Sequence, residues 1–274
     1  MKKFLIPINI SDYSEGTIQY EISIGIKSKA KLFFYHATNS PVKGKREEYE
    51  KYIRKAYKEL RVDFDDRSVE IIIEGTNFSN SDIKLLIEKY NIDLVIMGAS
   101  QEGLKTTFFG SHVSELINII SCPVLSVPHE VLDSNIDRIG YATELFDIAP
   151  RIAEIVPFAR LFNASIEAFH VYPVFPQTID IETFDVKKSL LQLRTENQYE
   201  KINLHFIRTP LDNEPIKGIL EFLTVYKPDL LVMCHKPKGL FDKLLDGSGA
   251  TISVVESSSI PILALNQQTA CKLL

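Results

Sequence analysis

The chain has 274 residues, of which 45% are hydrophobic and 24% charged, and its formal net charge is −5. This composition is ordinary for a globular protein and offers no basic surface that would attract nucleic acid or an anionic membrane. Three cysteines without a C-x-x-C pair argue against a disulfide framework and a zinc knuckle, so we expect reduced thiols at Cys122, Cys234 and Cys271.

The N-terminal segment begins like a signal peptide, but Pro7 and Asn9 interrupt its apolar residues. The chain also contains no run of 18 apolar residues that could form a membrane-spanning helix. We therefore expect a cytoplasmic location.

Segments rich in β-branched and aromatic residues alternate with segments whose apolar residues return every three or four positions. In the first half these patterns predict strands at 4–10, 31–37, 68–75, 93–98 and 123–127. Helices are expected between them, at 18–26, 47–60 and 81–90. In the second half we expect strands at 139–145, 165–171, 201–208, 229–234 and 261–265. Pro157 falls within a helical pattern, where we expect it to kink the helix.

The two halves of the chain repeat one another. DLVIMGAS at 93–100 recurs as DLLVMCHK at 229–236, and CPVLSVP at 122–128 recurs as IPILALN at 260–266. The second copies lie 136 to 138 residues after the first, which is the size of a small domain and too long for a solenoid repeat. A tandem duplication explains this pattern. We expect two domains, at 1–130 and 136–274.

Alternation of strands and helices favours right-handed crossovers and a parallel sheet with helices on both faces. The sequence thus predicts an α/β protein with two tandem doubly wound, Rossmann-like domains, each built on a five-stranded parallel sheet. Such domains bind ligands at the carboxyl ends of their strands, where the strand order reverses. In the first half those ends fall at 8–10, 37–38 and 98–111.

Four features, found twice in the same order, resemble the universal stress protein family in its tandem form. They are a Pro-Thr-Asp-like turn after the first strand, a fourth strand ending in Met-Gly, a loop closing on Gly-Ser, and a last strand of the Cys-Pro-Val-Leu type. The first three features fall at 7–9, 97–98 and 110–111, and again at 142–144, 233–234 and 247–248. The resemblance covers almost all of both halves and implies that they pack as an internal pseudo-dimer through their last strands.

The nucleotide-binding branch of that family carries the loop G-x2-G-x9-G-[ST] after the fourth strand. Its glycines let backbone amides approach phosphate oxygens, and the next helix directs its positive end at the charge. The resemblance therefore implies ATP, with Mg²⁺, in the first half. The implied site residues are Pro7, Ile8, Asn9, Ala37, Met97, Gly98, Ser100, Gly103, Gly110, Ser111, His112 and Val113.

The first half departs from the family pattern in three respects, two in the loop and one after the first strand. Gln101 stands where the second glycine belongs, and Gly98 and Gly110 are one residue too close together. Asn9 replaces the Asp that would accept hydrogen bonds from the nucleoside, so the acceptor keeps its oxygen and loses its charge. A structural interpretation stays open: Gly98 permits a tight strand exit, Ser111 caps the next helix and Asn9 closes a turn.

The second half departs further from the motif. Cys234 replaces the first glycine, and its side chain would crowd the path of the phosphates, while Pro237 stands near the second. Glu144 replaces the Asp and is one methylene longer. The turn at 247–249 keeps the character of an anion-binding turn. We nevertheless expect nucleotide binding in the first half only.

Several histidines invite functional interpretations. His36 and His170 occupy matching places at the end of the second strand, and we favour a tucked imidazole over a repeated catalytic role. His112 either contacts a terminal phosphate or is an exposed residue at a helix start. Cys234 and His235 resemble a metal pair, but adjacent residues on a strand point in opposite directions, so we expect no metal site.

The leading hypothesis is a stress-response regulatory or protective protein that binds ATP through its first half and acts by changing partners or shape. A scaffold that binds no nucleotide is a rival, because both loops are altered. A nucleotide-hydrolysing enzyme is disfavoured, since residues 99–109 offer only Glu102 and Lys105 and no carboxylate pair for Mg²⁺. The expected partners are an adenine nucleotide, unidentified proteins and a second copy of the chain as a homodimer.

Overall fold

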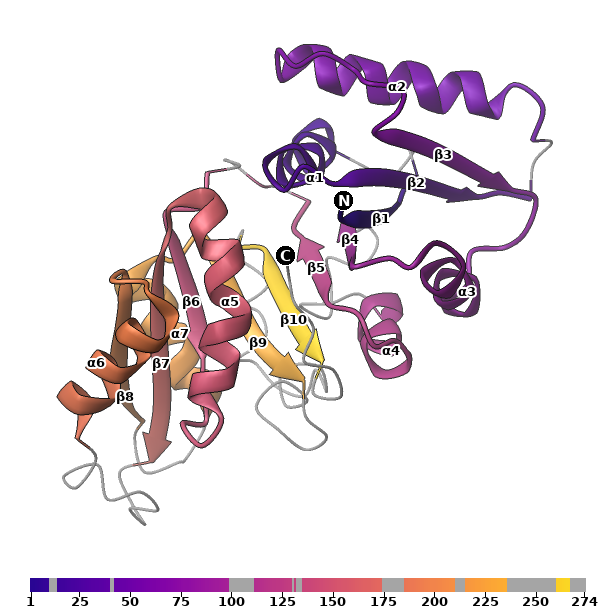
Figure 1. Cartoon of the computed structure of the whole chain (residues 1–274). Helices are drawn as coiled ribbons and strands as arrows, with labels where there is room; N and C mark the ends of the chain where they lie inside the picture. The colour runs from indigo at the N-terminus through magenta and orange to yellow at the C-terminus, as the bar shows by residue number, and fades with distance from the viewer. Residues whose placement is uncertain are drawn as a thin grey trace. The chain divides into compact units, whose positions relative to one another are not determined.

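The computed structural model describes residues 1–9, 14–39, 42–98, 111–129, 131, 135–173, 185–209, 215–235 and 260–266. The chain divides into two compact units, Met1–Ser134 and Asn135–Leu273 (Figure 1). In both units strands alternate with helices along the chain. We keep 1–130 and 136–274 as the proposed limits of the two domains.

The first unit contains five strands and four helices among its described residues. They are β1 (Lys3–Pro7), α1 (Glu15–Lys27), β2 (Lys31–Ala37), α2 (Lys45–Glu59), β3 (Val69–Glu74), α3 (Asn80–Tyr90), β4 (Leu94–Gly98), α4 (Ser111–Ile119) and β5 (Val124–Val127). The strand order is β3-β2-β1-β4-β5, and all neighbouring strands are parallel. Right-handed crossovers put α1 and α2 on one face of this sheet and α3 and α4 on the other (Figure 1).

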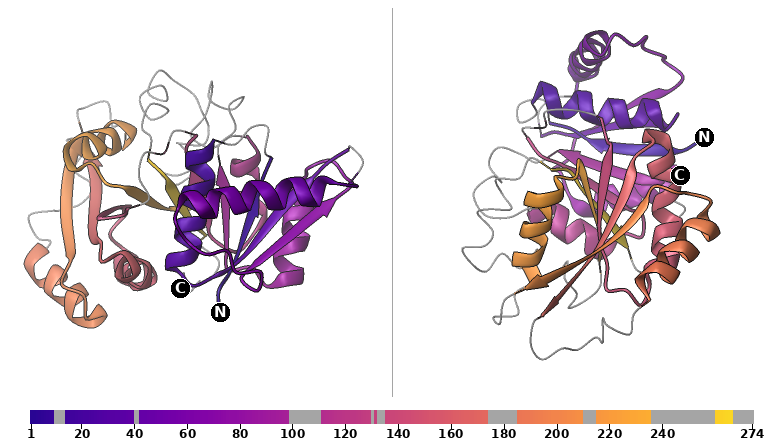
Figure 2. Two further views of the ribbon diagram at one scale, coloured as in Figure 1. Left: turned by 90° about the horizontal axis from the view of Figure 1, so that it is seen from above. Right: turned by 90° about the vertical axis from the view of Figure 1, so that its left-hand side faces the viewer.

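The second unit repeats this arrangement. Its described elements are β6 (Arg138–Ala142), α5 (Ile148–Phe162), β7 (Ser165–Pro173), α6 (Val186–Asn197), β8 (Ile202–Thr209), α7 (Pro215–Tyr226), β9 (Leu230–His235) and β10 (Ile262–Asn266). The strand order is β10-β9-β6-β7-β8, again with parallel neighbours. The right-hand view of Figure 2 shows α5 and α6 on one face of this sheet and α7 on the other.

The predicted fold class is confirmed, because each unit is an α/β unit with a five-stranded parallel sheet. The predicted packing of the halves as a pseudo-dimer stays a prediction. The strand predicted at 31–37 coincides with β2. β1 is shorter than the predicted 4–10 and ends at Pro7. One further ladder bond joins the Ile8 amide to the Tyr35 carbonyl, at 2.8 Å.

The core of the first unit is built from strands that are apolar along their whole length. Leu94, Val95 and Ile96 of β4 are at most 1% exposed, as expected for a parallel strand covered on both faces. A glycine lets α1 approach the sheet closely: a Cβ at Gly25 would lie 2.4 Å from Cδ2 of Leu32. In the described part of the chain, no helix has the length and apolar character needed to cross a membrane.

Pro157 lies inside α5, which continues through it to Phe162. A proline here cannot donate a hydrogen bond to the carbonyl one turn earlier. Burial of the neighbouring Ile155 and Phe158, which are at most 1% exposed, offsets that loss. The helical pattern is confirmed, and the predicted kink stays a prediction.

Candidate ligand site at the strand ends

The order of the strands in the first unit reverses between β1 and β4. Both strands are parallel neighbours, with Phe4 opposite Leu94 and Leu5 opposite Val95. The chain runs from β1 to β2 on one side and from β4 to β5 on the other. A crevice is expected at the carboxyl ends of two strands that diverge in this way.

The described part of the predicted site comes together at this edge of the sheet. Pro7 ends β1, and Ile8, which is buried, and Asn9, which is exposed, follow it. Met97 and Gly98 end the neighbouring β4, and both pair with β5. Ala37 ends β2 on the other side of β1.

The remaining predicted residues are placed less fully. Ser111, His112 and Val113 form the first turn of α4, which begins directly after the predicted phosphate loop. Ser100, Gly103 and Gly110 lie outside the described residues. Amide groups at a helix start suit an anion, and the position of α4 is compatible with the motif.

Two hydroxyl groups that the sequence interpretation missed fix the start of α1 near this edge. Ser14 is the N-cap of α1: its Oγ accepts a hydrogen bond from the Thr17 amide at 3.0 Å and donates one to the His129 carbonyl at 2.7 Å. Thr17 Oγ1 donates to the Pro128 carbonyl at 3.3 Å. These bonds tie α1 to the chain that leaves β5. A serine three residues before a threonine at a helix start was the available signal.

Both strand-end histidines are buried imidazoles that contact a backbone carbonyl. His36 Nδ1 lies 3.1 Å from the Ile8 oxygen, and His170 Nδ1 lies 2.8 Å from the Thr143 oxygen. Burial lowers the pKa of His36, and Lys45 adds to that effect, while the bond to Ile8 opposes it. Burial likewise lowers the pKa of His170. Both rings have the tucked geometry that the structural interpretation predicts.

At the carboxyl ends of the strands in the second unit, side chains occupy the place where the first unit has a glycine. The strand order of the second unit reverses between β6 and β9, and Cys234 stands at the place that Gly98 holds in the first unit. The Cys234 thiol lies 3.9 Å from the Tyr141 hydroxyl, and burial raises the pKa of the thiol to about 11. The buried guanidinium group of Arg151 forms ion pairs with two carboxylates: Nη1 lies 2.7 Å from Oε2 of Glu154, and Nε lies 3.7 Å from Oδ2 of Asp147. This edge carries side-chain bulk where the first unit has a glycine.

The metal interpretation of Cys234 and His235 finds no further ligand in the described ranges. Among those residues, no group of three His, Cys, Asp or Glu side chains is placed to hold a metal ion. Neither of the two described cysteines, Cys122 and Cys234, is part of a disulfide.

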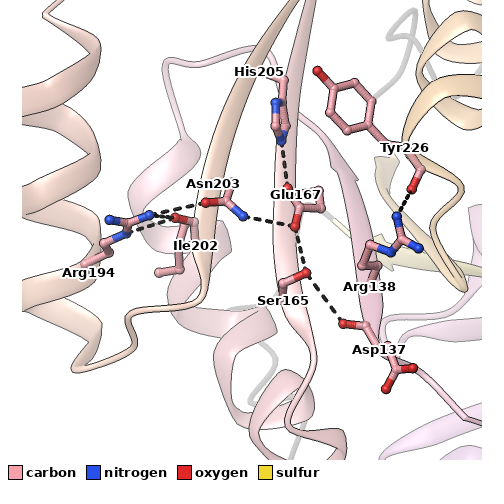
Figure 3. Close-up of polar contacts among 9 residues, drawn as sticks. All are labelled: Asp137, Arg138, Ser165, Glu167, Arg194, Ile202, Asn203, His205 and Tyr226. Atoms are coloured by element: carbon pink, nitrogen blue, oxygen red, sulfur yellow. Dashed lines mark hydrogen bonds and ion pairs between the residues drawn. The ribbon is translucent and has the colours of Figure 1, made fainter.

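A polar cluster that sequence analysis did not predict lies at the opposite, amino-terminal end of the second sheet (Figure 3). Glu167 of β7 is 7% exposed, and its Oε2 lies 2.7 Å from His205 Nε2 on β8. Its Oε1 accepts hydrogen bonds from Ser165 Oγ at 2.6 Å and from Asn203 Nδ2 at 3.0 Å. The His205 ring packs on Tyr226 of α7, with 4.3 Å between the ring centroids.

Electrostatics stabilise the carboxylate of this cluster. Burial alone would raise the pKa of Glu167, but the hydrogen bonds from His205, Ser165 and Asn203 outweigh burial and lower the pKa to about 2. Because the cluster lies away from the candidate ligand site, we assign it a structural role. A glutamate inside the apolar run SIEAFHV was the only signal for it in the sequence.

Comparison with known proteins shows the family of the first half of the chain. Residues 1–128 match the model of the universal stress protein family. The first half of the chain belongs to this family. The resemblance predicted from the repeated motifs is thereby confirmed, and the β1 and β4 ends described above lie within a universal stress protein domain. A search of the curated proteins found no match.

Solved structures extend the similarity of fold to the whole chain. A universal stress protein from Archaeoglobus fulgidus DSM 4304 has 17% sequence identity, with 96% of each chain covered and a TM-score of 0.65. A protein of unknown function from Pseudomonas aeruginosa PAO1 has 15% identity, with 97% of this chain and 92% of that chain covered and a TM-score of 0.66. Identities this low show the fold alone, and this fold spans both halves of the chain.

Proposed function

We propose that this chain is a stress-response regulatory or protective protein that binds ATP, with Mg²⁺, through its first half. The observation that carries the proposal is the meeting of β1 and β4 at the reversal of strand order. There an exposed Asn9 follows one strand and Gly98 ends the other. In doubly wound folds this is the place where nucleotides bind.

The residues present at this edge fit a nucleotide. Gly98 brings no side chain to the strand exit, so a phosphate can approach the backbone. Asn9 offers an amide oxygen and an amide nitrogen to a ribose or base, and its exposure leaves it within reach of a ligand. Ile8 and Met97 are 4% and 7% exposed and supply an apolar floor. The start of α4 follows the proposed phosphate loop and suits the anion.

The second half is proposed to lack a nucleotide site. A thiol stands where the first half has Gly98, and it packs against the Tyr141 hydroxyl at 3.9 Å. Arg151, the buried cation at this edge, is paired with Glu154 and Asp147. A phosphate would have to displace those carboxylates, which favours one nucleotide per chain.

The proposed action is binding rather than turnover, so we propose that the protein is not an enzyme. We further propose a cytoplasmic protein that works through protein partners and a second copy of itself, without nucleic acid or membrane contact. The formal charge of −5 supports the absence of a nucleic-acid partner. Nucleotide would then shift the chain between two shapes or two sets of partners.

A reciprocal exchange of side chains tests the proposal. Gly98→Cys copies the second half into the first, and Cys234→Gly makes the matched change in the second half. With the full chain and a fluorescent ATP analogue, we expect Gly98→Cys to weaken binding by about tenfold or more, because a side chain would occupy the phosphate path. Cys234→Gly should leave the first-half affinity unchanged, and thermal melts check that both variants fold.

Three outcomes would contradict the proposal. Equal affinity of Gly98→Cys and the unaltered chain would place any nucleotide elsewhere. Absence of binding by the unaltered chain would leave the scaffold alternative, which the altered second edge also supports. Release of phosphate on incubation with ATP would instead favour a hydrolase.

A further inference from the structure

In both units the residue that follows the first strand has a contact at its backbone amide and another at its backbone carbonyl. The Ile8 amide donates to the Tyr35 carbonyl at 2.8 Å, and the Ile8 carbonyl lies 3.1 Å from Nδ1 of His36. In the second unit the Thr143 amide donates to the Phe169 carbonyl at 2.9 Å, and its carbonyl lies 2.8 Å from His170 Nδ1. The histidine always follows the residue that accepts the amide bond.

This arrangement solves a local problem of the fold. A continuing parallel ladder would give the carbonyl a backbone N–H partner, but β1 ends at Pro7 and the next described element is α1. A buried carbonyl needs a hydrogen-bond partner, and the imidazole can supply one. Fixing the Ile8 peptide also fixes the direction in which Asn9 leaves the strand. His36 thus acts on a residue of the proposed site without being part of it.

The first unit adds a competitor for the same ring nitrogen. The Tyr49 hydroxyl of α2 lies 2.7 Å from His36 Nδ1, and the two rings are stacked with centroids 4.4 Å apart. Among the described residues of the second unit, the Phe206 ring lies edge-on to His170, with 6.4 Å between the ring centroids, and it carries no hydroxyl. Within the described ranges, the doubled contact occurs in the first unit, whose fourth strand ends in Gly98.

The Ile8 carbonyl and the Tyr49 hydroxyl compete for one ring nitrogen in both neutral tautomers, because the hydroxyl oxygen can share the Nδ1 hydrogen in one of them and the hydroxyl hydrogen can bind Nδ1 in the other. When the neutral ring carries its proton on Nδ1, this nitrogen donates to the Ile8 carbonyl. When the proton is on the other nitrogen, Nδ1 is an acceptor and takes the hydrogen of the Tyr49 hydroxyl. Nδ1 cannot donate to Ile8 and accept from Tyr49 at the same time. The first unit therefore has one state in which the strand end is held and another in which it is released.

We propose that His36 is a positioning residue for the nucleotide site of the first half, and that Tyr49 competes for it. The inference rests on the proposed ATP binding. Nucleotide selects the state in which His36 holds the Ile8 peptide and orients Asn9, and the Tyr49 bond opposes that state. Occupancy of the site is thereby linked to α2, which carries Tyr49.

Substitutions at His36 separate positioning from mere packing. The amide nitrogen of asparagine can occupy the place of Nδ1, so His36→Asn keeps a donor, and His36→Leu removes it. We expect His36→Leu to weaken ATP binding about tenfold and His36→Asn to restore most of the affinity. His170→Leu is the matched control, because it removes the same bond in the second unit, and its ATP affinity should equal that of the unaltered chain.

Tyr49→Phe provides an independent variant that keeps the stacked ring. Without the hydroxyl, the released state loses the hydrogen bond between Tyr49 and His36 Nδ1. We therefore expect the affinity for ATP to rise at least about twofold. Thermal melts of all four variants identify any that fail to fold, and Tyr49→Phe keeps the proposal testable if His36→Leu is one of them.

The outcomes distinguish this inference from the proposed function. Weak binding by His36→Leu, rescue by Asn and no change in His170→Leu would support it. Normal ATP affinity in His36→Leu, or equal losses in His36→Leu and His36→Asn with no gain in Tyr49→Phe, would overturn the inference while ATP binding stands. Absence of ATP binding by the unaltered chain would overturn both.

Discussion

Replacing Glu167 by glutamine removes the charge at the centre of the polar cluster in Figure 3 and keeps the size of the side chain. The pKa of Glu167 falls from an ordinary 4.5 to about 2 in the folded protein. A difference of that size corresponds to about 3 kcal/mol of stability at neutral pH. The carboxylate has hydrogen-bond partners in Ser165, His205 and Asn203, at 2.6, 2.7 and 3.0 Å. Hydrogen bonds to a charged group contribute a free energy of the same order of magnitude. We expect Glu167→Gln to lower the free energy of unfolding by about 2–3 kcal/mol.

Glu70→Gln is the matched control for this measurement. Glu70 of β3 pairs with Lys31 of β2 at 2.7 Å, but the side chains of Glu70 and Lys31 are 34% and 26% exposed. Solvent screens such a pair, so its loss should cost less than about 1 kcal/mol. Urea unfolding followed by far-UV circular dichroism suits a chain without tryptophan. A loss in Glu167→Gln no larger than that in Glu70→Gln would refute the reasoning.

The pH dependence gives a second check on Glu167. Its pKa is depressed in the folded state, so its stabilisation is complete above the ordinary value of 4.5 and is lost as the pH falls toward about 2. The stability difference between the unaltered chain and Glu167→Gln should therefore shrink across that window. A difference that stays constant from neutral pH to pH 2 would contradict the assignment.

The remaining predictions concern the strand ends and one helix contact. Asn9→Asp should tighten ATP binding, because a carboxylate accepts a stronger hydrogen bond from the nucleoside, and a calorimetric titration without a gain would indicate that the loop limits affinity instead. Gly25→Ala should lower the free energy of unfolding by about 1–2 kcal/mol, since the new Cβ would lie 2.4 Å from Leu32 Cδ2, and an unchanged urea midpoint would show that Leu32 can move. The Cys234 thiol, with its pKa of about 11, should react with iodoacetamide at pH 7.5 far more slowly than free cysteine, and equal rates would contradict its burial.

The fold could be predicted because its signals are local. An unbroken apolar run such as 31–37 indicates a buried parallel strand, and β2 occupies those residues. Alternation with helices then limits the topology to a doubly wound sheet. The candidate edge followed from the same logic, because the carboxyl ends of parallel strands gather at one edge. The described residues at 7–9 and 97–98 lie at the ends of the neighbouring strands β1 and β4, and their binding of a ligand stays a proposal.

The features that were missed depend on contacts between distant parts of the chain. Glu167 and His205 are 38 positions apart and meet only because of the register between β7 and β8. The contact of Tyr49 with His36 likewise depends on how α2 lies on the sheet. A residue pattern along one element carries no information on such a register. The predicted strand 4–10 ran past Pro7 for a related reason, since the Ile8 carbonyl lies 3.1 Å from His36 Nδ1, a contact that strand periodicity does not reveal.

We propose that one nucleotide binds per chain, at the strand-end site of the first half. Calorimetric titration of the nucleotide-stripped full chain with ATP and Mg²⁺ tests it most directly, because the heat gives affinity and stoichiometry together. We predict saturation at one ATP per chain. Absence of heat up to millimolar ATP would exclude this nucleotide site, and saturation at two ATP per chain would show that the second half also binds.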